Sequence, residues 1–465
     1  MRNSLSKGIL LVLIANIINL VAGVVSNLIL PKYLSVDSYA AIKEYQLYLS
    51  YVGIIHLGYN DAMYLRYGGK RVENLDGEEA GRGISTLRIY MLGVALVCAC
   101  VAFLLGNIIL TFISVISIST VLLSYYQFLY QACGEFKKYG RLLNIISVGS
   151  LVINSVLIFV FKSDNFLLFL SFYVLLNIIT YIVVEYSFSK TIRVRIPLFC
   201  FSAKRFISGI KEGILLTLGN FSSTLMTTLD RWFVKVLLTT THFAQYSFAV
   251  SMEYFLSVLV SPVTVTLYNF FCNHKEKDDV TKVRKCVVLF ASGIITSAYV
   301  ARFILDVFLT KYIESEKLIT FLFGAQLFYV VVKGVYVNVH KANGELKKYF
   351  RNLMIVIVFG FVANVIAYML CKGNLGFAIA TFCSAVFWFI LCLLEFKDMS
   401  KRELVYIILA ISAYLTTSIL LLPVPGFIVY VALLFLLSFS LMRDTLQYIL
   451  STIVSSVTRR RKAKE

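Results

Sequence analysis

The sequence predicts an all-α polytopic membrane protein of about fourteen transmembrane helices. We expect two six-helix lobes related by a parallel internal repeat, followed by two C-terminal helices. Composition is the first observation behind this prediction. Hydrophobic residues make up 59% of the 465 residues, charged residues only 15%, and the mean hydropathy is +0.82, far above that of soluble domains. The second observation is a series of long apolar segments, and the third is a polar block that occurs twice.

Fourteen apolar segments are long enough to cross a hydrocarbon core of about 30 Å, which takes about 20 residues of helix. They lie at 8–30, 39–59, 89–105, 108–131, 142–161, 166–186, 213–237, 243–271, 286–309, 318–340, 353–371, 374–394, 404–422 and 426–442. We therefore expect each segment to form one membrane-spanning helix.

A polar block repeats along the chain. QACGEFKKYGR at 131–141 recurs 210 positions later as KANGELKKYFR at 341–351, and the same offset aligns Asn154 with Asn364. Six predicted spans separate equivalent points of the two copies, so both copies enter the membrane in the same direction. Transporters with such parallel halves enclose a substrate site between them.

The repeat and the composition divide the chain into five parts. The segment between the lobes mixes apolar side chains with six Lys and Arg residues, which is typical of an interfacial helix. The predicted parts are an N-terminal lobe at 1–188, a cytoplasmic linker at 189–212, a C-terminal lobe at 213–395, two additional transmembrane helices at 396–446 and a basic cytoplasmic tail at 447–465.

The distribution of basic residues predicts the topology, because short translocated loops tend to lack Lys and Arg. With the N-terminus inside, the predicted cytoplasmic loops and both termini hold 34 of the 44 basic residues. The predicted outer loops hold five, which are Lys32, Lys162, Lys311, Lys317 and Lys372. We therefore expect both termini to be cytoplasmic. The net charge of +19 then reflects topology and contact with anionic lipid rather than binding of nucleic acid.

Polar side chains follow one face of two predicted spans. In the seventh span, Thr217, Asn220, Thr224, Thr228 and Arg231 recur at helical spacing. The first span has a comparable stripe made of Asn16, Asn19, Gly23 and Asn27. Such stripes predict that these residues line a substrate cavity. The alternative is that small and amide side chains only hold helices together.

A few charged residues lie inside predicted spans. A charge there has a high free-energy cost, so we expect each of these residues to be functional or to be paired with an opposite charge. Glu253 lies near the middle of the eighth span, and a hairpin of spans seven and eight would bring it within about one helical turn of Arg231. These two residues form either a neutralising structural pair or a proton-responsive carboxylate beside a substrate-binding cation. Asp230 should point about 100° away from Arg231 around the helix. Lys333 is the other buried cation that we expect to face the cavity.

The remaining charges have simpler explanations. Arg302 and Asp306 are four residues apart in the ninth span and are expected to pair with each other. Lys43, Glu44 and Lys235 are close enough to the outer interface to reach it. His56 and Asp61 close the second span, and we expect a packing role for the histidine. The repeated blocks supply topology anchors and a cytoplasmic gate, from Lys137, Lys138, Arg141, Lys347, Lys348 and Arg351.

Four segments together resemble a known family. They are the repeated A-x-G-E-x-K-K-Y-x-x-R block, the opening KGILLVLIANIINLVAGVVSNLILPKYLSVDSYA, HLGYNDAMYLRYGG, and LDRWFVKVLLTTTHFAQYSFAV. In order and spacing they are similar to the polysaccharide-biosynthesis flippases of the multidrug/oligosaccharidyl-lipid/polysaccharide exporter superfamily, over nearly the whole chain. The resemblance implies translocation of an undecaprenyl-pyrophosphate-linked repeat unit of O-antigen, capsule or exopolysaccharide. The movement would be from the inner to the outer leaflet of a bacterial inner membrane. The resemblance does not specify the glycan.

A pyrophosphate-linked glycan requires buried cations and many hydrogen-bonding side chains, and the seventh span offers both. The sequence has no phosphate-binding G-x-x-x-x-G-K-[ST] loop and no C-x-x-C pair, so we expect an ion gradient as the energy source, no cofactor and no metal. We expect a transporter by alternating access, such as an antiporter, and not an enzyme. Its partners would be membrane lipid and the glycosyltransferases and polymerase of the same pathway.

Three alternatives stay open. A lipid II flippase would carry a related substrate. A multidrug or small-cation exporter would favour buried carboxylates, whereas the charges predicted inside the membrane are mostly cations. A polysaccharide polymerase would need a sizeable outer loop, and the predicted outer loops are short.

Overall fold

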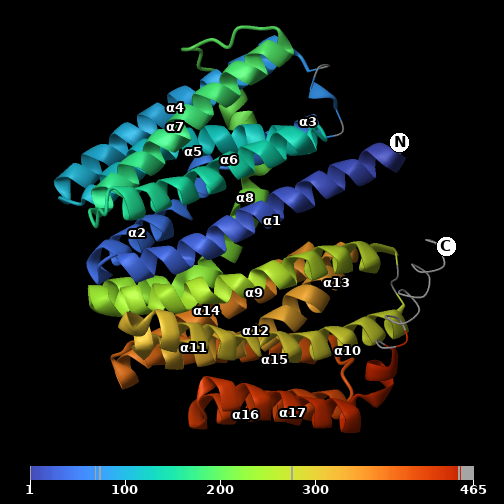
Figure 1. The fold of residues 1–465 in the computed structure, drawn as a ribbon. Coiled ribbons are helices and arrows are strands. Elements are labelled where there is room, and N and C mark those ends of the chain that lie inside the picture. Colours follow the sequence, from blue (N-terminus) through green and yellow to red (C-terminus); the bar gives the residue numbers. More distant parts are fainter. Residues whose placement is uncertain (1, 69, 73–74, 274–275, 449–450, 452–465) are drawn as a thin grey trace, which may run out of the picture. The chain divides into compact units, whose positions relative to one another are not determined.

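The computed structural model describes residues 2–448 and 451, apart from 69, 73–74 and 274–275 (Figure 1). Every regular element in this described part is helical. The chain divides into two compact units, Met1–Thr228 and Leu229–Glu465, which are described separately below. The division falls inside one long helix, α8, so this helix contributes residues to both units.

Unit 1 contains the helices that precede α8 and the larger part of α8 itself. They are α1 Arg2–Tyr33, α2 Val36–Leu49, η1 Val52–His56, α3 Tyr59–Tyr67, α4 Gly77–Leu104, α5 Ile108–Ala132, α6 Phe136–Ser155, the π-helical turn η3 Val156–Val160, α7 Phe166–Ile192 and α8 Ala203–Leu237. Helix α5 lies at the centre, because α3, α4 and α7 all pack against it, and α1 packs along α6 (Figure 1).

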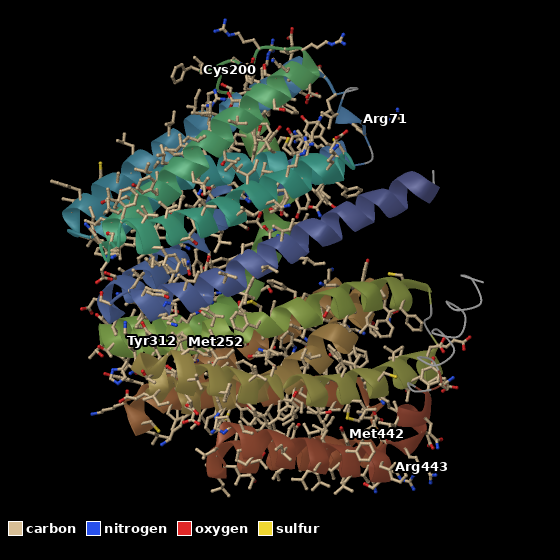
Figure 2. The ribbon with its side chains drawn as sticks, viewed as in Figure 1. Arg71, Cys200, Met252, Tyr312, Met442 and Arg443 are labelled. Carbon is tan, nitrogen blue, oxygen red and sulfur yellow. The ribbon has the colours of Figure 1, made fainter. Side chains whose placement is uncertain are left out.

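Unit 2 contains the end of α8 and all later helices. They are α9 Thr240–Asn273, α10 Lys277–Ile294, α11 Ser297–Phe308, η4 Thr310–Ser315, α12 Glu316–Val331, the π-helical turn η5 Val332–Tyr336, α13 Val337–Ala342, α14 Leu346–Cys371, α15 Asn374–Phe396, α16 Lys401–Leu420 and α17 Pro423–Leu441. Helix α12 is central and contacts α9, α10, α15 and α16. In its core, Met252 and Tyr312 are buried, and Phe248 stacks on Tyr312 with ring centroids 5.0 Å apart (Figure 2).

The same helix pairs recur in both units, which confirms the internal repeat as an architecture. The α5–α7 pair of unit 1 corresponds to α12–α15, and α6–α7 corresponds to α14–α15. The α4–α5 pair corresponds to α10–α12, and the packing of α2 and α3 on α5 corresponds to that of α9 on α12. Helices α16 and α17 pack against each other and have no counterpart in unit 1, as the sequence predicted for two additional helices.

The repeated polar block forms the same turn twice. Gly134 and Gly344 both have a φ of 72°, a left-handed conformation that favours glycine after a helix. The amide of Glu135 donates to the carbonyl of Tyr130 at 2.8 Å, and the amide of Glu345 donates to that of His340 at the same distance. This six-to-one hydrogen bond is the Schellman motif, so the duplicated sequence specifies a duplicated helix stop.

In the described part of the chain, ten helical segments are long and apolar enough to cross a membrane, and they coincide with ten of the fourteen predicted spans. The spans predicted at 8–30, 39–59, 213–237 and 243–271 are not among them. The span predicted at 39–59 is broken, because α2 ends at Leu49 and the chain passes through η1 before α3 begins. The linker predicted as a separate interfacial helix at 189–212 instead ends α7, connects through 193–202 and begins α8.

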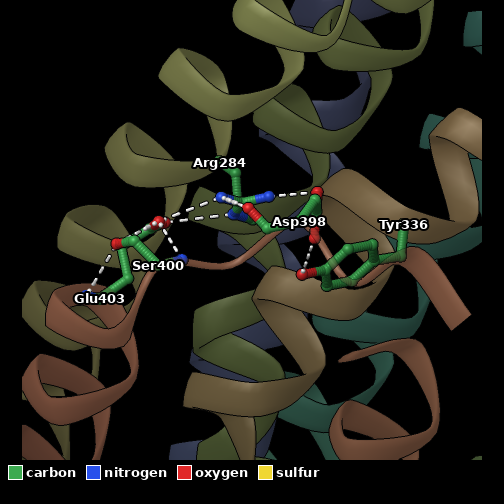
Figure 3. A network of polar contacts seen from close by, with 5 residues as sticks. All are labelled: Arg284, Tyr336, Asp398, Ser400 and Glu403. Atoms are coloured by element: carbon green, nitrogen blue, oxygen red, sulfur yellow. Dashed lines mark hydrogen bonds and ion pairs between the residues drawn. The ribbon is translucent and has the colours of Figure 1, made fainter. Parts of the chain in front are cut away.

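Buried arginines attach peripheral segments to the units. The Arg284 side chain of α10 is fully buried and pairs with Asp398 and with Glu403, whose carboxylate is 3.0 Å from Nη2 (Figure 3). Ser400 completes a capping box with Glu403 at the start of α16, and Tyr336 donates to Asp398 at 3.4 Å. These contacts fix the α16–α17 hairpin to the core of unit 2.

Unit 1 contains a comparable arginine. Arg88 of α4 pairs with Glu185 of α7 at 2.6 Å and donates to the carbonyls of Pro197 and Leu198 at 3.2 Å each. It therefore holds the connector between α7 and α8 against the helices. Both arginines lie near the start of the third helix of their repeat. The prediction of topology from Lys and Arg included them only as charges of cytoplasmic loops.

Replacing Arg284 with alanine should destabilise the protein by about 3–5 kcal/mol, because Glu403 would be left as a buried charge without its cation. The matched control is Arg402→Ala, since Arg402 is exposed on the same hairpin. Thermal unfolding of the purified protein in detergent would measure the difference. Equal melting temperatures for the two variants would contradict a structural role for the Arg284 cluster.

Candidate functional site

The break in the second predicted span is built from two consecutive left-handed residues. Leu57 has a φ of 51° and Gly58 a φ of 97°, so the chain leaves η1 and re-enters a helix at Tyr59 in a new direction. Interrupted membrane helices are tolerated where the freed backbone is buried in protein or lines a cavity. The break therefore indicates that the backbone at this point of unit 1 has a role other than the packing of helices.

A contact between two glycines brings α8 against this break. A Cβ added to Gly213 would lie 1.9 Å from the carbonyl oxygen of Gly58 and 2.7 Å from the amide nitrogen of Ala62. A Cβ added to Gly58 would lie 2.4 Å from the amide nitrogen of Ile214. No side chain fits between the two backbones, so glycine is required at both positions. One turn after Gly213, the approach brings Thr217 beside Asp61 of α3.

The unit 1 pocket, as we name it, lies next to this contact and has a volume of about 150 Å³. Its walls carry hydroxyl, amide and aromatic groups, one carboxylate and one imidazole, and no Lys or Arg. The lining residues are Ser50, Tyr51, Gly53, Ile54, His56, Asp61, Ser124, Phe128, Thr217, Asn220, Phe221 and Thr224. Such a surface suits neutral polar groups or a small cation rather than an anion.

Asp61 and His56 are the titratable groups of the pocket, and both are buried. Thr217 Oγ1 donates to Asp61 Oδ2. The amide of Gly58 donates to His56 Nδ1 at 3.1 Å, so this nitrogen is an acceptor and Nε2 carries the ring proton. Nε2 lies 4.0 Å from Asp61 Oδ2. The sequence interpretation of His56 as a packing residue is therefore incomplete, because the ring also faces a carboxylate.

The unit 2 cluster, as we name it, consists of Asp230, Arg231, Glu253, Gln326 and Lys333. Asp230 accepts hydrogen bonds from Tyr246 at 2.6 Å and from Thr381 at 2.9 Å. Glu253 accepts a hydrogen bond from Gln326, and Lys333 lies over the ring of Tyr329 at 5.0 Å. Arg231 and Lys333 both attract Glu253 electrostatically. The cluster balances two cations with two carboxylates.

Two members of the cluster, Gln326 on α12 and Lys333 on η5, lie on one partly accessible face. Every residue from Leu322 to His340 is buried except Gln326 and Lys333, which are half-buried and about two turns apart. Glu253 and Arg231 are also half-buried. The three charged side chains, Arg231, Glu253 and Lys333, are therefore half-buried and interact electrostatically, and Gln326 binds Glu253 by a hydrogen bond.

The predicted stripe on α8 divides between the two units. Asn220 and Thr224 line the unit 1 pocket, and Thr228 is buried in unit 1, where its hydroxyl contacts that of Tyr51. Arg231 belongs to unit 2. One helix thus presents hydroxyl and amide groups to unit 1 and charged groups to unit 2.

The stripe predicted on α1 is only partly described. The side chain of Asn16 lies outside the described residues. Asn19 Oδ1 is buried with no hydrogen-bond donor among the described side chains. The Asn27 side chain accepts a hydrogen bond from Lys43 Nζ at 2.9 Å, and Lys43 is buried against α1. The prediction that Lys43 extends to the outer interface is therefore wrong.

The predicted pair of Arg302 and Asp306 is wrong. Arg302 binds Glu316 at the start of α12, with Nε 2.9 Å from Oε1, and its Nη2 also donates to the carbonyl of Leu421 at 3.2 Å. The guanidinium points across to a neighbouring helix instead of along its own. These contacts join α11, α12 and the end of α16, which favours a structural role.

The predicted gate residues lie on the exposed ends of the repeated turns. Lys137, Arg141, Lys347, Lys348 and Arg351 are exposed. Lys138 pairs with Glu135 at 3.8 Å and Lys348 pairs with Glu345 at 2.5 Å, three residues back in each copy. Hydrogen bonds from Lys348 and His340 hold the pKa of Glu345 below its ordinary value.

The duplication extends beyond the residues singled out from the sequence. Glu185 and Glu395 are related by the same offset of 210, and both bind basic or amide side chains near a helix end. Asn352 donates to Glu395 at 2.5 Å, and His340 Nε2 is 3.5 Å from it. The offset could have identified this pair, whereas Gln326, Tyr329 and Thr381 carry no signal in a single sequence.

Comparisons with known proteins support the fold. No protein-family model and no curated protein matches the chain. Among solved structures, it is similar to the lipid II flippase MurJ in an inward closed conformation, with a TM-score of 0.64 and 14% identity over 94% of this chain and 100% of that one. The described chain therefore has the fold of a polytopic all-α transporter.

Two structures of the Vibrio cholerae MATE transporter VcmN are less similar. A structure of a mutant has a TM-score of 0.47 and 13% identity over 85% of this chain and 96% of that one. The bent form has a TM-score of 0.46 and 14% identity over 90% and 99%. Because both TM-scores are below 0.5, the assignment of the fold rests on MurJ.

The described residues contain no group of three or more His, Cys, Asp and Glu side chains placed to hold a metal ion. Unit 2 can exchange ionic partners, and unit 1 can offer hydrogen bonds around one carboxylate.

Gly213→Ala should abolish correct folding of unit 1 or destabilise it by about 1–3 kcal/mol or more, because the methyl group would overlap the Gly58 carbonyl. Gly219→Ala on the same helix is the control, since a Cβ there meets no atom within 4 Å. Protein level and melting temperature should fall in the first variant only. A normal melting temperature for Gly213→Ala would show that the two backbones are not in contact.

Proposed function

We propose that the protein is a flippase that moves an undecaprenyl-pyrophosphate-linked oligosaccharide from the cytoplasmic to the outer leaflet by alternating access. The observation that carries the proposal is the unit 2 cluster, where Arg231 and Lys333 are half-buried beside Glu253. In the resting protein the carboxylates compensate the cations. A pyrophosphate can replace Glu253 as the anion that compensates the two cations. Glu253 then keeps its hydrogen bond from Gln326.

The chemistry of the two cations fits this exchange. A guanidinium binds two phosphate oxygens through parallel hydrogen bonds, and an ammonium adds a mobile point charge. Buried cations that lose one anion must gain another, because an unpaired charge inside the bundle is costly. A substrate with a pyrophosphate group satisfies this requirement, whereas a neutral lipid does not.

The glycan end of the substrate requires different partners. Asn220 and Thr224 on the pocket wall of unit 1 offer the amide and hydroxyl groups that a hydroxyl-rich chain can use. Helix α8 carries both these residues and Arg231. The proposal assigns the hydroxyl-rich groups of the substrate to Asn220 and Thr224.

A lipid II flippase is the second candidate, favoured by the similarity of the fold to MurJ. Lipid II has a pyrophosphate as well, so the unit 2 cluster serves both substrates equally. The exporter of small cations is less well supported, because the cluster holds as many cations as carboxylates. A polymerase is also less well supported, because the described connections on the predicted outer side have at most five residues outside helices.

Arg231→Ala should reduce glycan export about tenfold or more, since charge-assisted hydrogen bonds contribute about 1.5–3 kcal/mol. Protein abundance should stay near that of the wild type, and Arg231→Lys should restore export only in part. Export is measured as surface glycan, and abundance by quantitative immunoblotting of membranes. The same cells should accumulate lipid-linked repeat units while synthesis continues.

A double variant separates substrate binding from a purely structural pair. If Arg231 only neutralises Glu253, each single replacement should lower abundance, and Arg231→Leu with Glu253→Leu should restore both abundance and export. If Arg231 binds the pyrophosphate, the double variant should be abundant and inactive. A fully active double variant would remove Arg231 from the substrate site.

A further inference from the structure

Asp61 differs from three other carboxylates of this protein that are buried or half-buried. Glu185 and Glu403 each bind an arginine, and Asp230 accepts two side-chain hydroxyl hydrogen bonds beside Arg231. Asp61 is only 6% exposed, and among the described residues it makes no ion pair with Lys or Arg. Its hydrogen-bond donor is the hydroxyl of Thr217.

The groups around Asp61 do not supply a compensating charge. From η1, the ring of His56 presents Nε2 at 4.0 Å. On α3 itself, Arg66 lies more than one turn away and is engaged by Glu212 of α8 at 2.5 Å. Helix α5 contributes Ser124 and Phe128 to the pocket walls, and its buried Tyr125 lies next to Ser124 in sequence. Besides Asp61 and His56, the pocket lining is uncharged.

The pocket gives small species access to this carboxyl group. Its volume of about 150 Å³ is enough for water to enter, because a water molecule needs only about 10–15 Å³ of such space. A buried carboxyl group without a counter-charge favours its protonated form, because removing a charge from water is costly. Hydroxyl and amide groups on the walls can accept or donate hydrogen bonds as the proton enters and leaves.

We infer that the unit 1 pocket is a proton-binding site in which Asp61 takes up and releases a proton, with His56 and Thr217 as its immediate partners. The ionised carboxylate accepts the hydrogen bond of Thr217. The protonated form loses one acceptor and becomes a donor, so the link between α3 and α8 changes with the proton. Ordered backbone contact at Gly58 and Gly213 keeps the two helices close enough for this link to form.

The inference deepens the proposed function and rests on it only for the use of the proton in transport. Thr217 and Arg231 both belong to helix α8. A proton bound at Asp61 therefore acts on the helix that also carries Asp230 and Arg231 of the unit 2 cluster. In this proposal a proton gradient acts at Asp61, a site different from the cations Arg231 and Lys333 of unit 2.

Infrared difference spectroscopy of the reconstituted protein across a pH titration tests proton binding without any substrate. The wild type should show a protonated carboxyl band that titrates, and Asp61→Asn should lose it. Asp230→Asn and Glu253→Gln are the controls and should retain it. Persistence of the band in Asp61→Asn, or its loss only in a unit 2 variant, would overturn the inference.

Thr217→Val provides a second variant that keeps the carboxyl group. Removing a hydrogen bond to the charged form should move the midpoint of the band up by about one pH unit. An unchanged midpoint would show that Thr217 is not linked to the proton. The spectroscopic result is independent of the proposed function. If the export assay fails while the carboxyl band titrates as expected, the proton site is supported and only the proposed substrate is contradicted.

Discussion

The cost of a charge inside a membrane bundle governs the organisation of this protein. Each buried arginine that attaches a segment is bound by carboxylates: Arg88 by Glu185, Arg284 by Asp398 and Glu403, and Arg302 by Glu316. These contacts connect helices and connectors that are distant in sequence. Arg231, Glu253 and Lys333 of unit 2 differ from these structural pairs. Their charges compensate one another, and their side chains are half-buried.

The two repeats share a framework and differ in chemistry. The identical turns at Gly134 and Gly344 and the recurring helix pairs show that the framework is duplicated. Unit 1 has a broken second helix and a pocket without Lys or Arg in its walls, whereas unit 2 has the charged cluster on α8, α9, α12 and η5. The two units thus combine a similar arrangement of helices with different side chains.

Hydropathy and the repeat allowed most of the fold to be predicted from the sequence, because long apolar helices and a copied glycine turn have strong local causes. Hairpin geometry predicted that Arg231 and Glu253 lie close together. The helix break was missed, because Leu57 adopts a left-handed conformation that its residue type disfavours. The partner of Arg302 was also missed, since spacing within one helix does not reveal which carboxylate a neighbouring helix presents.

We propose that this protein transfers a lipid-linked anion between leaflets. The most direct test is the rate at which purified protein in liposomes moves an undecaprenyl-pyrophosphate-linked oligosaccharide to the opposite leaflet. The rate is compared with that of a neutral glycolipid carrying the same sugars. We expect protein-dependent transfer of the pyrophosphate-linked substrate and little transfer of the neutral one. Equal transfer of both lipids, or a rate no higher than in empty liposomes, would contradict the account.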